Sequence, residues 1–287
     1  MLAISAGDGR VAHAITAPLA GLPRGKRLAL LKPGSGVGFD AQFELAASGT
    51  ATVEGRARLL DGAAQLVLIP IFDQRAVEQQ MALVADARTR GVQRIHVMSA
   101  AGADARSPVT LLRWLGLVER EVVASGLPHT VLRCTPYMQS IPLFLRRDAS
   151  GWRVAGPFRD TPFAWLDAGD AGTVLARRIA GPAGADLVCQ LSGPEELSFE
   201  AVAGLLASTL GETVRYVDIC RPEAAGLLEA NGLPPARIRA VTEYWDYLVS
   251  GVVRASCCDT AAKLLGRAPR RLADYLGEFA AELRATA

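Results

Sequence analysis

A glycine-rich turn near the start of the chain has the residue types of a phosphate-binding loop. The pattern Gly7-x-Gly9-x-x-Ala12 follows a short apolar run and opens into an amphipathic stretch that begins with Arg10 and Val11. This order of strand, turn and helix lets backbone amides approach a pyrophosphate, and the helix N-terminus adds positive potential. Asp8 is a difficulty, because its carboxylate would lie near the phosphates unless it points to solvent. The sequence favours nucleotide binding, with a tight turn that binds nothing as the alternative.

The residue that ends the second apolar run indicates the type of nucleotide. An NAD site usually has an Asp or Glu here, which binds the ribose hydroxyls. This run ends instead at Lys32, and no acidic residue occurs between Asp8 and Asp40. Because a cation suits a 2′-phosphate, we expect NADP(H) rather than NAD(H) if a cofactor binds. The alternative is that Lys32 is a solvated lysine at a strand end.

Metal, hydrolase and nucleic-acid chemistry are poorly supported. The five cysteines include no C-x-x-C pair and the chain has three histidines, so we expect no metal site and no disulfide framework. No Gly-x-Ser-x-Gly elbow or Ser-His-Asp order points to a hydrolase. With 31 basic and 29 acidic residues, the net charge of +2 gives no electrostatic case for binding nucleic acid or an anionic membrane.

Composition indicates a globular protein with a sizeable core. Half of the residues are hydrophobic and 21% are charged. No run of 18 apolar residues predicts a membrane span, and the first residues lack the features of a signal peptide. We therefore expect a cytoplasmic protein. The excess of Arg over Lys and the abundant Ala are typical of a GC-rich, bacterial genome.

The elements that position the glycine turn alternate between two types. Short apolar runs and amphipathic stretches follow one another through the first two thirds of the chain, as in βα units with a parallel sheet. The sequence predicts strands over 2–5, 27–31, 64–72, 94–99 and 129–133, and helices over 10–19, 76–90 and 108–125. The fold class is α/β, a doubly wound, mostly parallel sheet of the Rossmann type. Residues 1–140 are expected to form the dinucleotide-binding domain.

Past residue 140 the pattern changes. Residues 151–170 contain turn residues and two tryptophans. Strands are predicted over 187–191 and 215–219, and helices over 170–178, 198–210, 222–231, 235–252 and 269–285, with Asp170 as an N-cap. Residues 141–287 are expected to form a smaller α/β substrate lobe, interleaved with the sheet rather than folded as an independent domain.

Several segments together resemble the NmrA-like group of atypical short-chain dehydrogenases/reductases. They run in the family's order over essentially the whole chain: Ala6–Ala12, Ala87–Ala103, Leu111–Trp114, Ser125–Arg133, Leu191–Glu195 and Val214–Val217. The resemblance implies a Rossmann domain, a small C-terminal substrate lobe and NADP(H) bound across the strand ends. It also implies that Pro70 and Ile71 form an apolar wall beside the nicotinamide, and that Ser99 lines the same site.

The chain departs from the family pattern in the turn and in the catalytic residues. Ala6 and Ala12 stand where the family usually has glycines, and the Asp that commonly faces the adenine is absent near residues 47 and 48. Loss of the cofactor is therefore an alternative. None of the five tyrosines has a Lys four residues later, so the proton-donating pair of standard short-chain reductases is missing. Tyr137, Asp167 and Ser99 remain as the catalytic candidates.

These observations give one leading hypothesis and two alternatives. The leading one is an NAD(P)H-dependent reductase of a small, hydrophobic, conjugated substrate such as a quinone or enone, in bacterial specialised metabolism. The first alternative keeps the fold for a cofactor-independent isomerase, cyclase or dehydratase that uses Tyr137 or Asp167. The second is a non-enzymatic NADP(H) redox sensor. The sequence leaves open whether the chain forms a homodimer.

Overall fold

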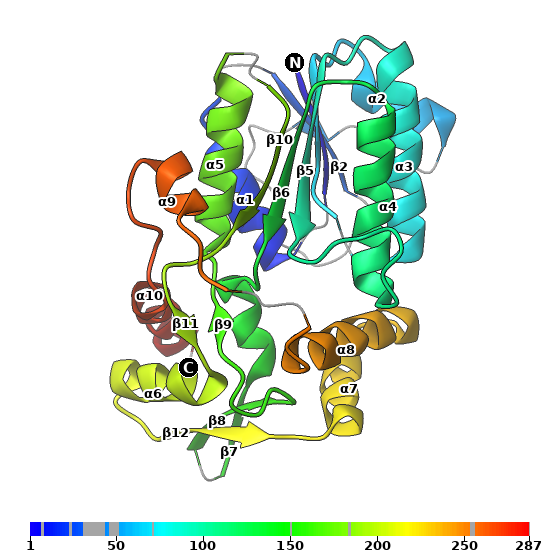
Figure 1. Ribbon diagram of the computed structural model, residues 1–287. Helices are drawn as coiled ribbons and strands as arrows, with labels where there is room; N and C mark the ends of the chain where they lie inside the picture. The colour runs from blue at the N-terminus through cyan, green and yellow to red at the C-terminus, as the bar shows by residue number, and fades with distance from the viewer. Residues whose placement is uncertain are drawn as a thin grey trace. The chain divides into compact units, whose positions relative to one another are not determined.

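The computed structural model divides the chain into two compact units. The first unit comprises Met1–Cys134 and Ala168–Gln190, and the second comprises Thr135–Asp167 and Leu191–Ala287. The structure describes residues 1–6, 9–22, 25–30, 44–45, 52–70, 72–149, 151–182, 185–252 and 256–286. Figure 1 shows the elements of both units. A segment from the second half of the chain thus completes the N-terminal unit, whereas the expected role of the other unit as a substrate lobe stays a prediction.

The first unit is built on a seven-stranded sheet with the order β10-β6-β5-β4-β1-β2-β3. Its strands are β1 (Leu2–Ala6), β2 (Lys26–Leu30), β3 (Glu44–Leu45), β4 (Gln65–Leu68), β5 (Arg94–Ala100), β6 (His129–Cys134) and β10 (Leu187–Leu191). The five described pairs from β3 to β6 are all parallel. The strand order reverses at β1, which lies between β2 and β4. This is the doubly wound arrangement that the sequence predicts.

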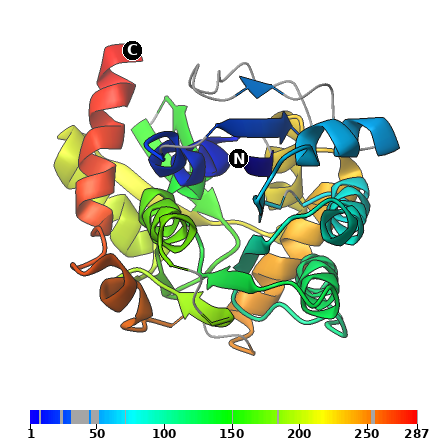
Figure 2. The same ribbon diagram turned by 90° about the horizontal axis from the view of Figure 1, so that it is seen from above.

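Helices cover both faces of this sheet. They are α1 (Arg10–Ala20), α2 (Val53–Leu60), α3 (Gln74–Thr89), α4 (Thr110–Ala124) and α5 (Ala168–Ala180). Figures 1 and 2 show α1 and α5 on one face and α2, α3 and α4 on the other. Because both faces are covered, the central strands are apolar throughout, and all five residues of β1 are buried. Helices α1 and α5 approach so closely that a Cβ on Gly172 would collide with the carbonyl of Ile15.

The second unit has an aromatic core beside two small sheets. One sheet has the order β12-β8-β7 and the other the order β11-β9. The elements are η1 (Met138–Phe144), β7 (Leu145–Asp148), β8 (Gly151–Gly156), β9 (Phe163–Ala164), β11 (Glu196–Leu197), α6 (Phe199–Leu210), β12 (Val214–Asp218), α7 (Arg221–Ala230), α8 (Pro235–Val249), α9 (Thr260–Leu265) and α10 (Leu272–Thr286). Phe158 lies at the centre of the core, stacked on Phe199 at 4.3 Å and edge-on to Phe144 and Phe163.

A row of three arginines crosses the β12-β8-β7 sheet. Arg146 on β7 is the direct partner of Arg153 on β8, which is the direct partner of Arg215 on β12. Asp148 offsets part of this charge, with Oδ2 3.4 Å from Arg153 Nε and 3.6 Å from Arg215 Nη2. Burial and the charge of Arg153 lower the pKa of Arg146. Like charges directly opposite on neighbouring strands destabilise a sheet, so this row lowers the stability of the unit.

Several elements differ from the sequence expectations. The strand predicted over 64–72 spans only Gln65–Leu68, because the chain leaves the sheet at Ile69 and Pro70. Asp170 is not an N-cap, since α5 begins at Ala168 and Asp170 lies in its first turn. The region 151–170, expected to be turns, contains β8 and β9. No helix among the described residues is long and apolar enough to cross a membrane.

The arginine row generates a prediction about stability. Arg146→Thr, on the edge strand β7, removes a like-charge contact with Arg153 and should raise the free energy of unfolding by about 0.5 kcal/mol. Arg147→Thr is the matched control on the other face of β7, where Arg147 lies over the Trp152 ring and pairs with Glu212. This control should lower the free energy of unfolding by about 1 kcal/mol. Urea unfolding of both variants measures the difference, and a loss of stability in Arg146→Thr would contradict the prediction.

His96 in β5 generates a prediction about pH. Its side chain is fully buried, with Nε2 2.8 Å from Gln65 Oε1. Burial, followed by the charges of Arg94 and Arg178, lowers the pKa of His96 from 6.5 to about 3. The unfolded chain therefore binds a proton that the folded chain does not, and stability falls as pH falls from about 6.5 towards about 3.

Replacement of this histidine by an apolar residue should flatten that dependence. Between pH 7 and pH 5 the wild type should lose about 2 kcal/mol more unfolding free energy than His96→Leu, whatever their absolute stabilities at pH 7. Chemical unfolding at both pH values measures the two slopes. Parallel slopes for the two proteins would show that His96 does not remain neutral in the fold.

Candidate functional site

The helix that follows β1 has an N-cap residue without a side chain. Strand β1 ends at Ala6 and α1 begins at Arg10, with Val11 in its first turn. The N-cap residue is Gly9, and the first turn contains no acidic residue. By contrast, Thr52, Asp73 and Ser198 cap α2, α3 and α6 with their side chains. Gly7 and Asp8 lie outside the described residues.

The space around Gly9 suits the approach of a ligand. A Cβ placed on Gly9 would meet no atom of the described residues within 4 Å. Ala12 is buried one turn into the helix, which fits its predicted role in close packing of α1 on the sheet. Backbone amides and the positive end of the dipole at such a terminus favour a phosphate group. The described residues of this turn therefore fit a dinucleotide pyrophosphate.

The connection from β1 to α1 lies at the point where the strand order of the sheet reverses. Ser5 on β1 pairs with Leu68 on β4, so the carboxyl ends of both strands reach the same sheet edge. Pro70 follows β4 at this edge, just after Ile69 donates its N–H to the Ser5 carbonyl at 2.8 Å. Ligands of open α/β sheets bind at such a reversal. Lys32 and Ile71, which are also expected to contact the cofactor, lie outside the described residues.

Ser99 near the end of β5 belongs to a buried ionic network. Its Oγ donates to Glu119 Oε1 on α4 at 2.5 Å. The same carboxylate accepts from Arg133 on β6, through Nε at 3.1 Å and Nη2 at 2.5 Å. The hydrogen bonds to Glu119 raise the pKa of Arg133 despite its partial burial. The hydroxyl proton of Ser99 is therefore directed to a carboxylate that a guanidinium also binds.

Tyr137 and Asp167 lie in the second unit, on two segments that pair with each other. Tyr137 forms an isolated parallel bridge with Leu166, the residue before Asp167. Asp167 is buried, and its Oδ2 accepts from Gln139 Nε2 at 2.9 Å and lies 3.5 Å from Arg270 Nη1. Partial burial alone would lower the pKa of Arg270. The hydrogen bond to Glu278 and the charge of Asp167 outweigh this effect and raise the pKa of Arg270.

These contacts change the interpretation of the predicted catalytic residues. The structure brings Tyr137 and Asp167 together in one unit and places Ser99 with the glycine turn in the other. The carboxylate of Asp167 contacts an amide and a guanidinium, and these contacts suit it to position Gln139.

Sequence reasoning did not assign roles to Glu119, Arg133, Gln139 or Arg270. Glu119 carried a usable signal, because it occupies the apolar face of its helix with Leu115 and Val122, all of them buried. A carboxylate in that position needs a buried cationic partner. Arg270 is far from Asp167 in sequence, and no local pattern connects the two.

Comparison with known proteins gives relatives of several kinds. An NAD(P)H azoreductase of Xenophilus azovorans is 28% identical over 250 residues, which are 83% of this chain and 85% of the relative. Agroclavine dehydrogenase of Claviceps fusiformis is 24% identical over 200 residues, covering 67% of this chain and 66% of the relative.

Solved structures share the fold over nearly the whole chain. An NADPH-dependent quinone oxidoreductase of Escherichia coli, complexed with NADPH, has a TM-score of 0.76 at 21% identity over 97% of this chain and 99% of the other. The negative transcriptional regulator NmrA, in complex with NADP, has a TM-score of 0.75 at 21% identity, covering 100% and 97%.

The family is shown by sequence. The model of the NmrA-like family matches residues 42–254, which is most of the chain. The match covers the segments that carry the resemblance from Ala87 to Val217, and the segment Ala6–Ala12 lies outside it. The chain belongs to the NmrA-like family.

Proposed function

We propose that this chain is an NADPH-dependent reductase of a small, hydrophobic, conjugated acceptor, such as a quinone, an enone or an azo compound. The observation that carries the proposal is the N-terminus of α1, whose N-cap is Gly9 and whose first turn has no acidic residue, at the reversal point of the sheet. Relatives named as an NAD(P)H azoreductase and an NADPH-dependent quinone oxidoreductase support the reaction class.

The chain's own residues divide the binding of the cofactor among them. The backbone amides of Arg10 and Val11 would hold the pyrophosphate. Gly7 and Gly9, which precede them, would let the pyrophosphate approach the backbone. Lys32 would hold the 2′-phosphate. Pro70, Ile71 and the wall at Ser99 would enclose the nicotinamide and exclude water. The cofactor, when bound, supplies the hydride.

The network around Ser99 limits where a proton comes from. Ser99 donates to the Glu119 carboxylate, which Arg133 also binds, so its hydroxyl is engaged rather than aimed at a substrate. The pair of tyrosine and lysine that donates a proton in standard short-chain reductases is missing from the sequence. An acceptor whose reduced form takes its proton from water needs no such donor. This favours a quinone or an azo compound over a simple ketone.

Tyr137 and Asp167 would then serve binding rather than proton transfer. We propose that Tyr137 contacts the substrate through its half-buried ring. Asp167 would hold the segment that follows β6 in place through Gln139 and Arg270. In this account the protein contributes orientation and exclusion of water more than acid–base chemistry.

The cofactor assignment predicts a preference that one lysine determines. Purified protein should bind NADPH about tenfold or more tightly than NADH, and Lys32→Ala should remove most of that difference, because the 2′-phosphate loses a charged partner. Lys26→Ala is the matched control. It removes a lysine from the start of β2, whereas Lys32 follows the end of the same strand. Isothermal titration calorimetry with both cofactors measures the four affinities.

Two results of this titration would contradict the proposal. Equal affinity for NADH and NADPH in the wild type would remove Lys32 from the site. Binding of neither cofactor would mean that the altered turn has lost the dinucleotide, and it would favour cofactor-independent chemistry on the same fold.

The proton account predicts mild effects at two hydroxyl groups. Ser99→Ala and Tyr137→Phe should each keep kcat with a quinone within about tenfold of the wild type, because removal of a general acid typically costs 10²–10⁴-fold. Tyr137→Phe should act mainly on KM. Steady-state kinetics across a pH series separates the two parameters. A loss of kcat beyond about a hundredfold, together with the disappearance of a pH-dependent step, would identify that residue as the proton donor.

A further inference from the structure

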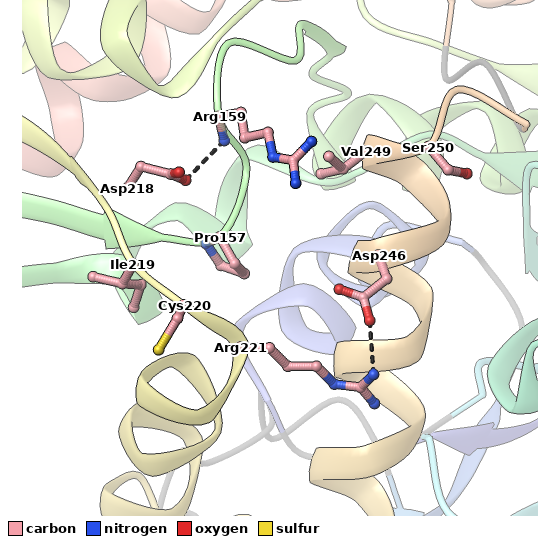
Figure 3. Close-up of a pocket in the computed structure, with 9 residues that line it drawn as sticks. All are labelled: Pro157, Arg159, Asp218, Ile219, Cys220, Arg221, Asp246, Val249 and Ser250. Atoms are coloured by element: carbon pink, nitrogen blue, oxygen red, sulfur yellow. Dashed lines mark hydrogen bonds and ion pairs between the residues drawn. The ribbon is translucent and has the colours of Figure 1, made fainter.

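A cavity of about 620 Å³ lies within the second unit, between three segments. They are the loop after β8 (Pro157 and Arg159), the link from β12 to α7 (Asp218 to Arg221) and the last turn of α8 (Asp246 to Ser250). Figure 3 shows these side chains around the cavity. Its volume is in the range of small-molecule sites, and no residue of the proposed reductase site lines it.

Arg159 has an unusual backbone conformation. Its φ angle is +50°, and among the described residues it is the one non-glycine residue with a positive φ. This left-handed region costs a residue with a side chain about 1 kcal/mol or more. The conformation is held by the Arg159 N–H, which donates to Asp218 Oδ1 at 2.9 Å. A glycine would adopt this geometry at no steric cost, so the arginine occupies this position against its backbone preference.

The surrounding contacts fix the loop rigidly. The preceding residue, Phe158, is buried in the aromatic core and donates its N–H to the Tyr216 hydroxyl at 3.1 Å. That hydroxyl in turn lies 2.9 Å from the same carboxylate oxygen of Asp218 that binds the Arg159 N–H. Burial, assisted by the charge of Asp218, raises the pKa of Tyr216, which therefore remains a hydrogen-bond donor.

The guanidinium of Arg159, which is exposed, is the cation of the cavity that has no ion-pair partner among the described residues. Figure 3 shows that its side chain points away from Asp218 and towards Val249 on α8. No hydrogen bond or ion pair joins this guanidinium to any residue in the described part of the chain. The other cation at the cavity, Arg221, pairs with Asp246 through Nη1 and Oδ2 at 2.8 Å. Asp218 is occupied by the loop backbone and Tyr216.

The rest of the cavity selects the size and charge of an occupant. Pro157, Ile219 and Val249 supply apolar surface beside the guanidinium. A planar carboxylate matches the two-pronged donor geometry of a guanidinium. A multiply charged anion is disfavoured, because the carboxylates of Asp218 and Asp246 also line the cavity.

We propose that this cavity binds a small molecule with one carboxylate and a flat apolar body, and that Arg159 is the residue that binds the carboxylate. The site is separate from the reductase chemistry and does not depend on it. The rival explanation is that Arg159 only stabilises the negative C-terminal end of the α8 dipole. The two explanations differ in what the loss of Arg159 does to stability.

The test uses the full chain with two probes of matched shape, 2-naphthoate and the neutral 2-naphthalenemethanol. Arg159→Gln and Arg159→Gly should weaken naphthoate binding about tenfold or more, because the carboxylate loses its charged partner. Binding of the neutral probe should stay the same in all proteins. Arg239→Gln, at an exposed arginine of α8, is the matched control and should bind both probes like the wild type. Calorimetry or ligand-observed nuclear magnetic resonance gives the affinities.

Stability provides the second measurement. Arg159→Gly relieves the left-handed conformation and should melt at the same temperature as the wild type or higher while it loses naphthoate binding. A lower melting temperature for both Arg159 variants would support the rival role at the α8 terminus and overturn the proposal. Equal naphthoate affinity in wild type and Arg159→Gln, absence of naphthoate binding to the wild type, or its displacement by NADPH would overturn it as well.

Discussion

The organisation of the first unit depends on β1, a strand buried along its whole length between two parallel neighbours. Because β1 pairs with β2 on one side and β4 on the other, the direction in which the sheet grows reverses there. The chain leaves β1 at Ala6 and enters α1 at Arg10, after the N-cap residue Gly9. The positive end of a helix and the carboxyl ends of two strands therefore occur at one place. The proposed binding of the cofactor pyrophosphate follows from this arrangement of the helix N-terminus and the strand ends.

The second constraint is the ionic network of Ser99, Glu119 and Arg133. A buried carboxylate is tolerated in α4 only because a guanidinium from β6 and a hydroxyl from β5 satisfy it. The same contacts tie three neighbouring elements together near the strand ends. They leave Ser99 as part of the framework, and the proposed chemistry must then work without a proton donor from the protein. The need to satisfy the buried Glu119 carboxylate thus favours acceptors whose reduced form takes its proton from water.

Much of the first unit could be predicted from the sequence, because its signals are local. Buried apolar strands and amphipathic helices have periodicities that do not depend on distant contacts. The segment at 64–72 shows the limit: it is apolar throughout, and only pairing with β1 and β5 decides that the strand ends at Leu68.

The second unit was harder to predict for a physical reason. Strand β8 reads as Gly-Trp-Arg-Val-Ala-Gly, and its arginine is paired with two further arginines, which no pattern of strand formation favours. Asp167 was expected to act as an acid or base, but its partners Gln139 and Arg270 come from distant segments. The left-handed conformation of Arg159 has no signal in composition at all. Contacts that join residues far apart in sequence decide these sites.

The central claim is that NADPH delivers a hydride to a conjugated acceptor without a proton donor from the protein. The most direct measurement is stopped-flow oxidation of NADPH by a quinone under single-turnover conditions, repeated across a pH series. The account predicts oxidation whose rate changes little between about pH 6 and pH 9. Absence of oxidation with any conjugated acceptor, or a rate that follows the titration of one protein group, would contradict it.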